Sequence, residues 1–454
     1  MMSKTVRAHA LDVLVKVGDN GAFSHLLIDQ TLKNNALDIR DQGLFTELVY
    51  GTLNRKLTLA YDLDQFVKKT GKLQSWVKWL LYLSFYQLKY LDKVPDHAVV
   101  NEAVEIAKKR GHQGIVKLVN GVLRQALRQG FPSYETIEPV TKRLSIETST
   151  PEWLMERWID SYGLEKAEKI ATAQLIKADK AVRVNLLKMT REDVKQQLIE
   201  DGFEVEASPF SSKGLIINAG NILKHPFFDE GIVTIQDQTS MLVGEMMAVE
   251  KDQVILDSCS APGGKTTDLA ERLSNTGRVY SYDLHEKKTT LVDKKAAQLG
   301  LINIKTKAMD ARELDQLFEV KTFDRILIDA PCSGFGVIRT KPDIKYTKTS
   351  EDVLNLSMIQ FDMLNTIMPL LKEDGKLIYS TCTIDPTENE ALIAEFLSGQ
   401  TRYEVDPTFF TELPAFLQQS VGVTPFGLQI FPDDFHTDGF FLTRLQYKQA
   451  TDET

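Results

Sequence analysis

Three cysteines are the residues of this chain whose type and position point most directly to chemistry. They are Cys259 in DSCSAPGGKT, Cys332 in DAPCSGFG and Cys382 in YSTCTIDP. Each follows an apolar run at the start of a turn, which in a parallel α/β domain is where ligands and catalytic groups gather. A single free cysteine is also commonly a small buried hydrophobe. Two thiols at neighbouring strand ends beside a Gly-rich turn favour covalent attack on a substrate.

The elements that must position these thiols belong to a chain of 454 residues, which is long enough for two or three domains. Residues 1–130 have helical periodicity and predict an all-α domain of five to seven helices. Residues 131–180 form a linker with helices, and residues 181–245 a small α/β unit. From 246 to 448 strands alternate with helices, which is typical of a doubly wound parallel sheet. The predicted fold class is therefore multi-domain.

Several classes of protein are excluded by composition. No apolar stretch approaches the length of a membrane helix, and the first residues lack the apolar region of a signal peptide, so we expect a cytoplasmic protein with no membrane partner. The three thiols are odd in number and lack metal-ligand spacing, which predicts neither a disulfide framework nor a metal site. A monomer is the expected oligomeric state.

The net charge of −9 conceals an uneven distribution. Residues 1–130 carry a net charge of +7, and the remainder of the chain carries −16. A basic helical domain on an acidic body fits a protein whose first domain binds a polyanion, with the cluster Lys108, Lys109 and Arg110 as a candidate face. A solvated, lysine-rich helical surface explains the same numbers equally well.

The Gly-rich turn DSCSAPGGKTTDLAERL runs from a strand into a helix and is a candidate cofactor loop. Gly263 and Gly264 allow the backbone to approach a ligand, and the following helix points its amide end at that ligand. The spacing matches neither a phosphate loop nor the GxGxxG dinucleotide turn. A tight packing turn would look similar. The acids that follow the next strands strengthen the ligand interpretation.

Those acids are Asp283, Asp310 and Asp329, which come at the ends of three successive predicted strands. Asp283 stands about 20 residues past the glycines, where an acid typically holds ribose hydroxyls. Asp310 could reach an adenine edge. Each acid alone is more often a turn or helix cap. The series fits a nucleoside cofactor without a phosphate clamp, which favours S-adenosyl-L-methionine over NAD.

The motifs DSCSAPGGKT, DAPCSGFGVIRTKPD and STCTIDPTENE resemble those of the NOL1/NOP2/Sun family of RNA cytosine-C5 methyltransferases. The resemblance covers roughly residues 140–445 and includes RVN at 183–185, QDQTS at 236–240 and DGFF at 438–441. The helical first third is similar to NusB-type RNA-binding domains. This pairing resembles the bacterial members that methylate 16S rRNA, and it implies cytosine 967 as the target and incompletely assembled 16S rRNA as the partner.

The resemblance also implies roles for individual residues. Cys382 would be the nucleophile that adds to carbon 6 of the base, Cys332 would assist product release, and Asp329 would contact the base or the cofactor. Cys259 is expected to pack the turn and not to act as a third catalytic thiol. The resemblance places S-adenosyl-L-methionine against Cys259, Ser260, Ala261, Pro262, Gly263, Gly264, Lys265, Asp283, Asp310 and Asp329.

Other motif residues have two interpretations. Arg339 and Lys341 are candidates for contact with RNA phosphate, or they keep a loop soluble. Tyr346 stands where the family usually has tryptophan, so a stacking role is open. Asp385, Pro386 and Glu388 fit the cap, first turn and third-position acid of a helix.

Two other functions remain as alternatives. The first is a non-catalytic RNA-binding or assembly factor of the NusB type, against which the cysteine pair and the complete cofactor loop argue. The second is a nicotinamide oxidoreductase on the same sheet, against which the absence of GxGxxG argues.

Overall fold

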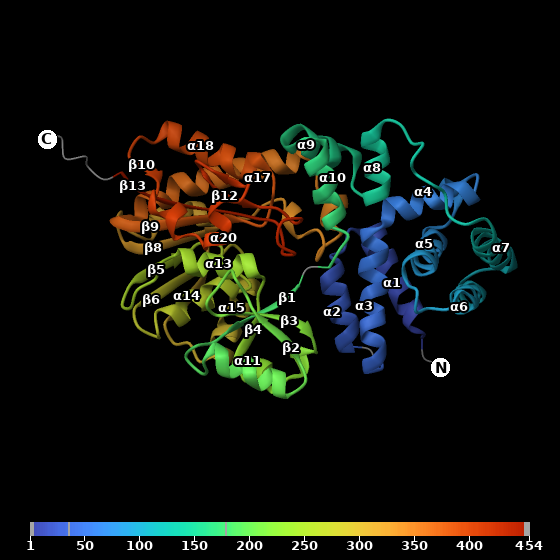
Figure 1. Ribbon diagram of the computed structural model, residues 1–454, viewed down its shortest axis with the longest axis horizontal. Coiled ribbons are helices and arrows are strands. Elements are labelled where there is room, and N and C mark those ends of the chain that lie inside the picture. The colour runs from blue at the N-terminus through green and yellow to red at the C-terminus, as the bar shows by residue number, and fades with distance from the viewer. Residues whose placement is uncertain (1–3, 35–36, 178, 449–454) are drawn as a thin grey trace. The chain divides into compact units, whose positions relative to one another are not determined.

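The structure is a computed structural model that describes residues 4–34, 37–177 and 179–448. The chain divides into two compact units (Figure 1). The helical unit comprises Met1–Lys177 together with Ile338–Lys348, and the catalytic unit comprises Ala178–Val337 and Thr349–Thr454. A short piece of the second half of the chain therefore belongs to the unit formed by the first half.

The helical unit is built from amphipathic helices with clear ends. Thr5 caps the first helix by accepting a hydrogen bond from the backbone N–H of Ala8 at 3.4 Å, and Gly21 ends it in the left-handed region at φ 63°. The described helices are α1 (Val6–Asn20), α2 (Ser24–Asn34), α3 (Ile39–Asn54), α4 (Lys56–Phe66), η1 (Thr70–Lys72), α5 (Ser75–Tyr90), α6 (Asp96–Arg110), α7 (Gln113–Gln129), α8 (Val140–Thr148), α9 (Glu152–Tyr162), α10 (Leu164–Ala173) and α16 (Ile344–Thr347).

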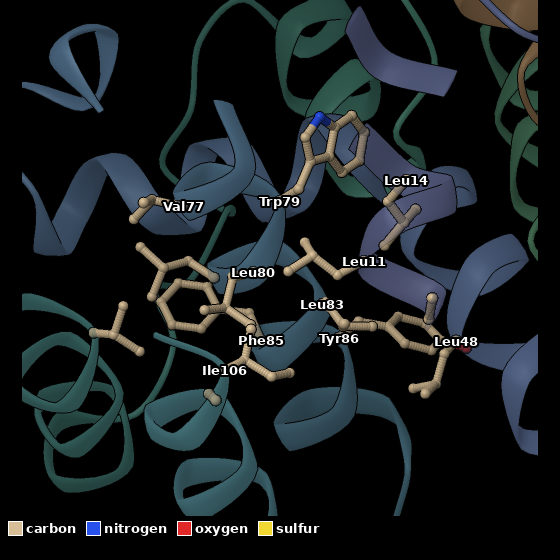
Figure 2. Close-up of a cluster of buried hydrophobic side chains, with 14 of the residues drawn as sticks. Leu11, Leu14, Leu48, Val77, Trp79, Leu80, Leu83, Phe85, Tyr86 and Ile106 are labelled. Carbon is tan, nitrogen blue, oxygen red and sulfur yellow. The ribbon is translucent and has the colours of Figure 1, made fainter. Parts of the chain in front are cut away.

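Helix α5 is the centre of this unit. Its sequence is apolar on nearly every side, as expected for a helix surrounded by others. Figure 2 shows its side chains between Leu11 and Leu14 of α1, Leu48 of α3 and Ile106 of α6. The residues of α5 in this cluster are Val77, Trp79, Leu80, Leu83, Phe85 and Tyr86.

The segment Ile338–Lys348, called here the inserted segment, is held by polar contacts inside the helical unit. Lys345 is 1% exposed, and its Nζ donates to the backbone oxygen and Oδ1 of Asn54 at 2.9 and 2.8 Å. The Tyr346 hydroxyl donates to the backbone oxygen of Ser149 at 3.1 Å. Burial holds the pKa of Lys345 well below its usual range. The aromatic side chain at position 346 is thus a packing and hydrogen-bonding group.

The catalytic unit begins with a small antiparallel sheet in the order β2-β3-β1-β4. Thr190 caps its helix by accepting from the backbone N–H of Asp193 at 3.2 Å. The elements are β1 (Lys180–Val184), α11 (Arg191–Glu200), β2 (Glu204–Ala207), β3 (Gly214–Ala219), η2 (Ile222–Lys224), α12 (Pro226–Asp229) and β4 (Val233–Ile235).

The large sheet has the order β11-β12-β13-β9-β8-β5-β6-β7, with β10 paired to β13. The five strands from β9 to β7 are parallel, as predicted from the alternation of strands and helices. They are β5 (Val254–Asp257), β6 (Arg278–Asp283), β7 (Ile304–Ala308), β8 (Phe323–Asp329) and β9 (Leu371–Thr381). The short connecting helices are η3 (Ala311–Gln316), η4 (Phe335–Val337), η5 (Met368–Leu370) and η6 (Pro386–Glu388).

Helices cover both faces of this sheet (Figure 1). One face packs on α13 (Gln238–Met246), α14 (Gly264–Arg272) and α15 (Glu286–Leu299) through residues such as Ile255 and Val279. The other packs on α17 (Ser350–Ile367) and α18 (Glu390–Gly399) through Leu256 and Ile326. Neighbouring strand residues thus point to opposite layers.

The sheet differs from the predicted all-parallel arrangement at its C-terminal edge. Strand β13 (Phe440–Tyr447) runs antiparallel to β9, and it is followed outward by β12 (Gly427–Ile430) and β11 (Val423–Thr424). The remaining elements of this region are β10 (Tyr403–Val405), α19 (Thr408–Glu412) and α20 (Ala415–Gln418). No long helix separates β11, β12 and β13 from one another, so these strands carry no signal of strand–helix alternation.

Candidate active site

The two C-terminal cysteines come together at the carboxyl ends of neighbouring strands. Strands β8 and β9 pair in parallel, with Asp329 opposite Ser380, which confirms the predicted adjacency. Cys332 and Cys382 follow these strand ends, and their Sγ atoms lie 3.4 Å apart. Both thiols are half-buried. The strand-end placement that the sequence predicts therefore brings both sulfurs into one site.

Two glycines hold the loops that carry the cysteines. The backbone N–H of Gly336 donates to the carbonyl oxygen of Cys382 at 3.0 Å, and that of Gly439 donates to the oxygen of Gly336 at 2.9 Å. A Cβ atom at position 336 would lie 2.0 Å from the carbonyl oxygen of Gly439. The GFG and DGFF motifs thus meet where three backbone segments approach closely, and only glycine fits there.

The buried carboxylate of Glu388 holds the loop that carries Cys332. Its Oε2 accepts from the backbone N–H of Ser333 at 2.9 Å and from Nε2 of Gln360 at 3.0 Å, and the same Gln360 nitrogen donates to Pro331 O at 2.8 Å. The side chain is fully buried, and burial raises the pKa of Glu388 to about 7.

Asp385, Pro386 and Glu388 take the cap, first and third helical positions that the sequence predicts. Asp385 caps by accepting from the backbone N–H of Thr387 at 3.0 Å, and the turn it starts is the short η6. The α-helix begins only at Glu390, so Glu388 points away from the helix end and into the protein.

Asp329 joins the thiols to the cofactor loop. Its Oδ1 accepts from the Ser380 hydroxyl at 2.9 Å, and its Oδ2 pairs with Nζ of Lys265 at 2.8 Å. Burial opposes the charge on Lys265, but Asp329 and then Cys382 together raise the pKa of Lys265. A cation is thus held beside the thiol of Cys382, where it favours the thiolate form.

The three thiols have different environments. The hydrogen bond with Cys382, together with burial, holds the pKa of Cys332 well above its usual range, so Cys332 stays protonated and can donate to the Cys382 sulfur. Burial also raises the pKa of Cys259, which lies in the turn after β5. Cys382 is therefore the thiol that has both a cation, Lys265, and a hydrogen-bond donor, the S–H group of Cys332, beside it.

The Gly-rich turn has the geometry of a ligand loop. Gly263 adopts φ 101°, and a Cβ there would lie 3.1 Å from Cα of Val292. The backbone N–H of Ser260 donates to Tyr282 O at 2.8 Å, which ties the turn to the end of β6. The turn therefore depends on glycine for both conformation and close approach.

Buried polar atoms at this turn fit a polar ligand. Among the described residues, Asp257 Oδ1 and Ser260 Oγ are buried without a hydrogen-bond partner. Burial raises the pKa of Asp257 to about 7, although Thr266 donates to its other oxygen at 2.7 Å. Buried polar atoms normally have partners, so these two suit the polar groups of a nucleoside-bearing cofactor.

The strand-end acids differ in how far their carboxylates are already engaged. Asp283 accepts backbone N–H groups of Ala261 at 3.4 Å and His285 at 3.1 Å, at the mouth of the turn. Asp310 caps η3 by accepting from the backbone N–H of Arg312 at 2.9 Å, and it also binds that guanidinium at 2.6 Å. The hydrogen bonds from Arg312 lower the pKa of Asp310. Asp310 is thus already occupied by a local contact.

The candidate RNA-binding residues lie in the helical unit. Lys108, Lys109 and Arg110 are exposed at the C-terminal end of α6, where Lys108 pairs with Glu105 at 2.6 Å. Lys341 is exposed in the inserted segment, whereas Arg339 is only 8% exposed. A phosphate contact by Arg339 would require its guanidinium to become accessible.

Two side chains of the catalytic unit make contacts at the site that the sequence did not reveal. Gln360 on α17 has no motif that would single it out. Arg183 was noted only as part of the RVN motif, and its contacts with α14 depend on tertiary packing.

Two absences hold for the described residues as a whole. Across them, no group of three or more His, Cys, Asp or Glu side chains is placed to hold a metal ion. In the part of the chain that the structure describes, none of the helices has both the length and the apolarity needed to cross a bilayer.

Three family models match the chain. One described as 16S rRNA methyltransferase RsmB/F covers residues 245–446, and one described as the NusB family covers residues 4–128. A third, described as the ferredoxin-like domain of RsmF/B-like methyltransferases, covers residues 150–222. These matches confirm the predicted multi-domain class with its NusB-like, small α/β and methyltransferase parts.

Known proteins are similar over nearly the whole chain. The probable ribosomal RNA small subunit methyltransferase B of Bacillus subtilis (strain 168) is 46% identical over 99% of this chain and 100% of its own. The ribosomal RNA small subunit methyltransferase B of Proteus mirabilis (strain HI4320) is 32% identical over 98% of this chain and 99% of its own. The crystal structure of PH0851 superposes with a TM-score of 0.81 at 22% identity, covering 98% of this chain and 99% of that one, and so shares the fold.

Proposed function

Because the chain belongs to the RsmB/F family of 16S rRNA methyltransferases, we propose that it methylates carbon 5 of a cytosine in 16S rRNA through a covalent bond between Cys382 and carbon 6. S-adenosyl-L-methionine is the proposed methyl donor, and cytosine 967 is the proposed target. The single observation that carries the proposal is the pair of thiols at 3.4 Å beside the Lys265–Asp329 ion pair.

The chemistry explains why a thiolate is needed. Carbon 5 of cytosine is a poor nucleophile until a thiolate adds to carbon 6, which forms an S–C6 bond and moves the electron pair of the C5–C6 double bond to carbon 5. Lys265 favours the thiolate of Cys382, and Cys332 donates a hydrogen bond to it before attack. S-adenosyl-L-methionine supplies the methyl group as a sulfonium when bound.

The remaining residues complete the reaction. Asp329 is the proposed contact of the base or the cofactor, and the support for this role is that Ser380 and Lys265 hold its two oxygens at the end of β8. Once carbon 5 carries the methyl group, its proton passes to a water molecule and the C–H electron pair re-forms the C5–C6 double bond. The S–C6 bond breaks in the same elimination, and Cys382 leaves as the thiolate. Cys332, the nearest thiol to Cys382, assists this elimination.

The substrate must offer its base face to Cys382. Carbon 6 is attacked perpendicular to the ring, so a paired cytosine has to leave its stack first. We therefore propose 16S rRNA that is not fully assembled into the subunit as the partner, and the cytoplasm as the place of action.

The test compares the two cysteine variants of the full chain on 16S rRNA. We expect Cys382→Ala to abolish both methylation and the covalent complex. We expect Cys332→Ala to form the complex and release it slowly, so that a slowly migrating band accumulates on a denaturing gel. Bisulfite sequencing of the rRNA reports whether cytosine 967 is the modified base.

Two results would overturn the assignment. The roles are reversed if Cys382→Ala still methylates while Cys332→Ala does not. A purely non-catalytic RNA-binding factor is indicated if the unaltered protein binds S-adenosyl-L-methionine but modifies no cytosine of the rRNA.

A further inference from the structure

A buried network of charges joins the small sheet to α14, the helix that follows the Gly-rich turn. Its cations from the small sheet are Arg183 on β1 and Lys213 just before β3, which are 1% and 3% exposed, and Arg272 of α14 itself pairs with Asp268 at 3.2 Å. Its anions on α14 are Asp268 and Glu271, which are 1% and 4% exposed. Lys213 Nζ lies 2.7 Å from Asp268 and 2.6 Å from Glu271, and Arg183 Nη2 lies 2.9 Å from Glu271.

Stability alone does not account for such a network. Removing several charges from water costs free energy that their attraction only partly repays, and apolar side chains of similar volume are often as stable. What charged groups add is direction, because a guanidinium donates in a fixed plane. The guanidinium group of Arg183 can therefore fix the positions of the acceptors to which it donates.

Arg183 reaches the Gly-rich turn itself. Its Nη1 donates to the carbonyl oxygen of Gly264 at 2.6 Å, and its Nη2 donates to the Thr267 hydroxyl at 3.0 Å. The Thr267 hydroxyl in turn donates to the carbonyl oxygen of Gly263 at 2.7 Å. One side chain thus holds the carbonyls of both glycines, directly and through Thr267, and Gln236 accepts from Nη1 and orients it.

Lys213 provides an internal comparison. It belongs to the same network and is similarly buried, but its ammonium group donates to the carboxylates of Asp268 and Glu271, one or more helical turns from the glycines. Loss of either cation leaves buried carboxylates with fewer partners. Only loss of Arg183 also frees the turn.

We propose that Arg183 is a positioning residue for S-adenosyl-L-methionine, so that the small α/β subdomain forms part of the cofactor site as its outer support. The inference rests on the proposed function, in which the Gly-rich turn holds that cofactor. Gly263 at φ 101° holds a backbone conformation that favours glycine, and fixing this residue before the cofactor binds lowers the conformational entropy lost on binding.

The test uses Arg183→Lys, Arg183→Met and the control Lys213→Met in the full chain, with calorimetric titration of S-adenosylhomocysteine. Arg183→Lys keeps the charge but loses the fork. We expect Arg183→Met to weaken binding by about tenfold or more and Arg183→Lys by less. Lys213→Met should stay within about twofold of the unaltered protein while its unfolding midpoint falls. Faster amide exchange across residues 263–267 should accompany the Arg183 variants alone.

The outcomes distinguish failure of the proposed function from failure of the proposed role of Arg183. If the unaltered protein fails to bind S-adenosylhomocysteine, the proposed cofactor is wrong, and the role of Arg183 is wrong with it. If it binds, and Arg183→Lys binds equally well with unchanged exchange, the inference alone is overturned. Equal weakening by Arg183→Lys and Lys213→Met would also overturn it, because the network would then act only on stability.

Discussion

Glu388 connects the two cysteine loops through a single carboxylate oxygen. It lies in the loop after Cys382, and it accepts the backbone N–H of Ser333, the residue that follows Cys332. Its second oxygen is buried without a partner among the described residues. A buried carboxyl in this position prefers to hold a proton, which explains the direction of its pKa.

This preference predicts a pH dependence of stability. The folded pKa of about 7 lies above the ordinary value of 4.5, so the folded state binds the proton more tightly than the unfolded state. The stabilisation is complete below pH 4.5 and is lost as pH rises through 7. We expect the free energy of unfolding of the unaltered protein, relative to Glu388→Gln, to fall by about 3 kcal/mol across this window.

Urea unfolding of both proteins at pH 4.5 and pH 8 measures the difference. Glu395→Gln, on the exposed side of α18, is the matched control. A difference between Glu388→Gln and the unaltered protein that stays constant with pH would contradict the prediction.

We expect the reactivity of Cys382 to depend on the charge at position 265. Without a cation beside the thiol, the thiolate fraction near neutral pH falls, and one lost opposite charge commonly shifts a pKa by about one unit or more. We expect Lys265→Met to slow alkylation of Cys382 by iodoacetamide about tenfold at pH 7. Peptide mapping by mass spectrometry identifies the labelled cysteine.

Lys265→Arg serves as the control for that experiment because it retains the positive charge. It should be alkylated at Cys382 nearly as fast as the unaltered protein. Equal rates in the methionine and arginine variants would show that Lys265 has no part in activating the thiol.

At the scale of elements, the turn between β8 and the inserted segment is the most tightly constrained part of the site. A methyl group at Gly336 would meet the carbonyl of Gly439 at 2.0 Å and that of Cys382 at 2.7 Å. We expect Gly336→Ala to destabilise the protein by about 1–3 kcal/mol and to displace Cys382. Covalent complex formation should fail while S-adenosylhomocysteine binding, measured by calorimetry, persists.

Gly121→Ala is the matched control, because nothing lies within 4 Å of a Cβ at that position of α7. Alanine there should leave both measurements unchanged or raise stability slightly. A Gly336→Ala protein that forms the complex at the normal rate would show that the close approach is not required.

The sequence predicts helices and strands well where the spacing of apolar residues reflects which side of the element is buried. The alternation of apolar strands with helices predicts β5 to β9. The position of Cys332 and Cys382 after the ends of neighbouring parallel strands predicts that the two thiols lie in one site. The antiparallel strands at the C-terminal edge have no such alternation. Glu388 takes the third helical position that the sequence predicts, yet no local pattern reports that its carboxylate accepts from the backbone N–H of Ser333. The contact of Arg183 with Gly264 joins two elements 81 residues apart, which no local pattern reports.

At the scale of the whole molecule, charge is distributed between a basic first part and an acidic remainder. Contacts with RNA phosphates release counterions, so each one adds to the salt dependence of binding. We expect replacement of Lys108, Lys109 and Arg110 by alanine to reduce the slope of log K against log salt by about 2. Filter binding of 16S rRNA fragments at several salt concentrations measures the slope.

The control replaces Lys321, Lys372 and Arg402, which lie near the amino ends of β8 and β9 and beside β10, at the opposite end of the strands from the thiols. This triple variant should keep the slope of the unaltered protein. Equal slopes in both triple variants would remove the end of α6 from the RNA-binding surface.

The inserted segment has a consequence for the order in which the protein is made. The helical unit includes Ile338–Lys348, which the ribosome adds after most of the catalytic unit has been synthesised. Until then the backbone oxygen and Oδ1 of Asn54 lack the hydrogen bonds from Lys345 Nζ, and the backbone oxygen of Ser149 lacks the hydrogen bond from the Tyr346 hydroxyl. The first unit to leave the exit tunnel is therefore not the first to be finished, and its final packing is a late event of biosynthesis.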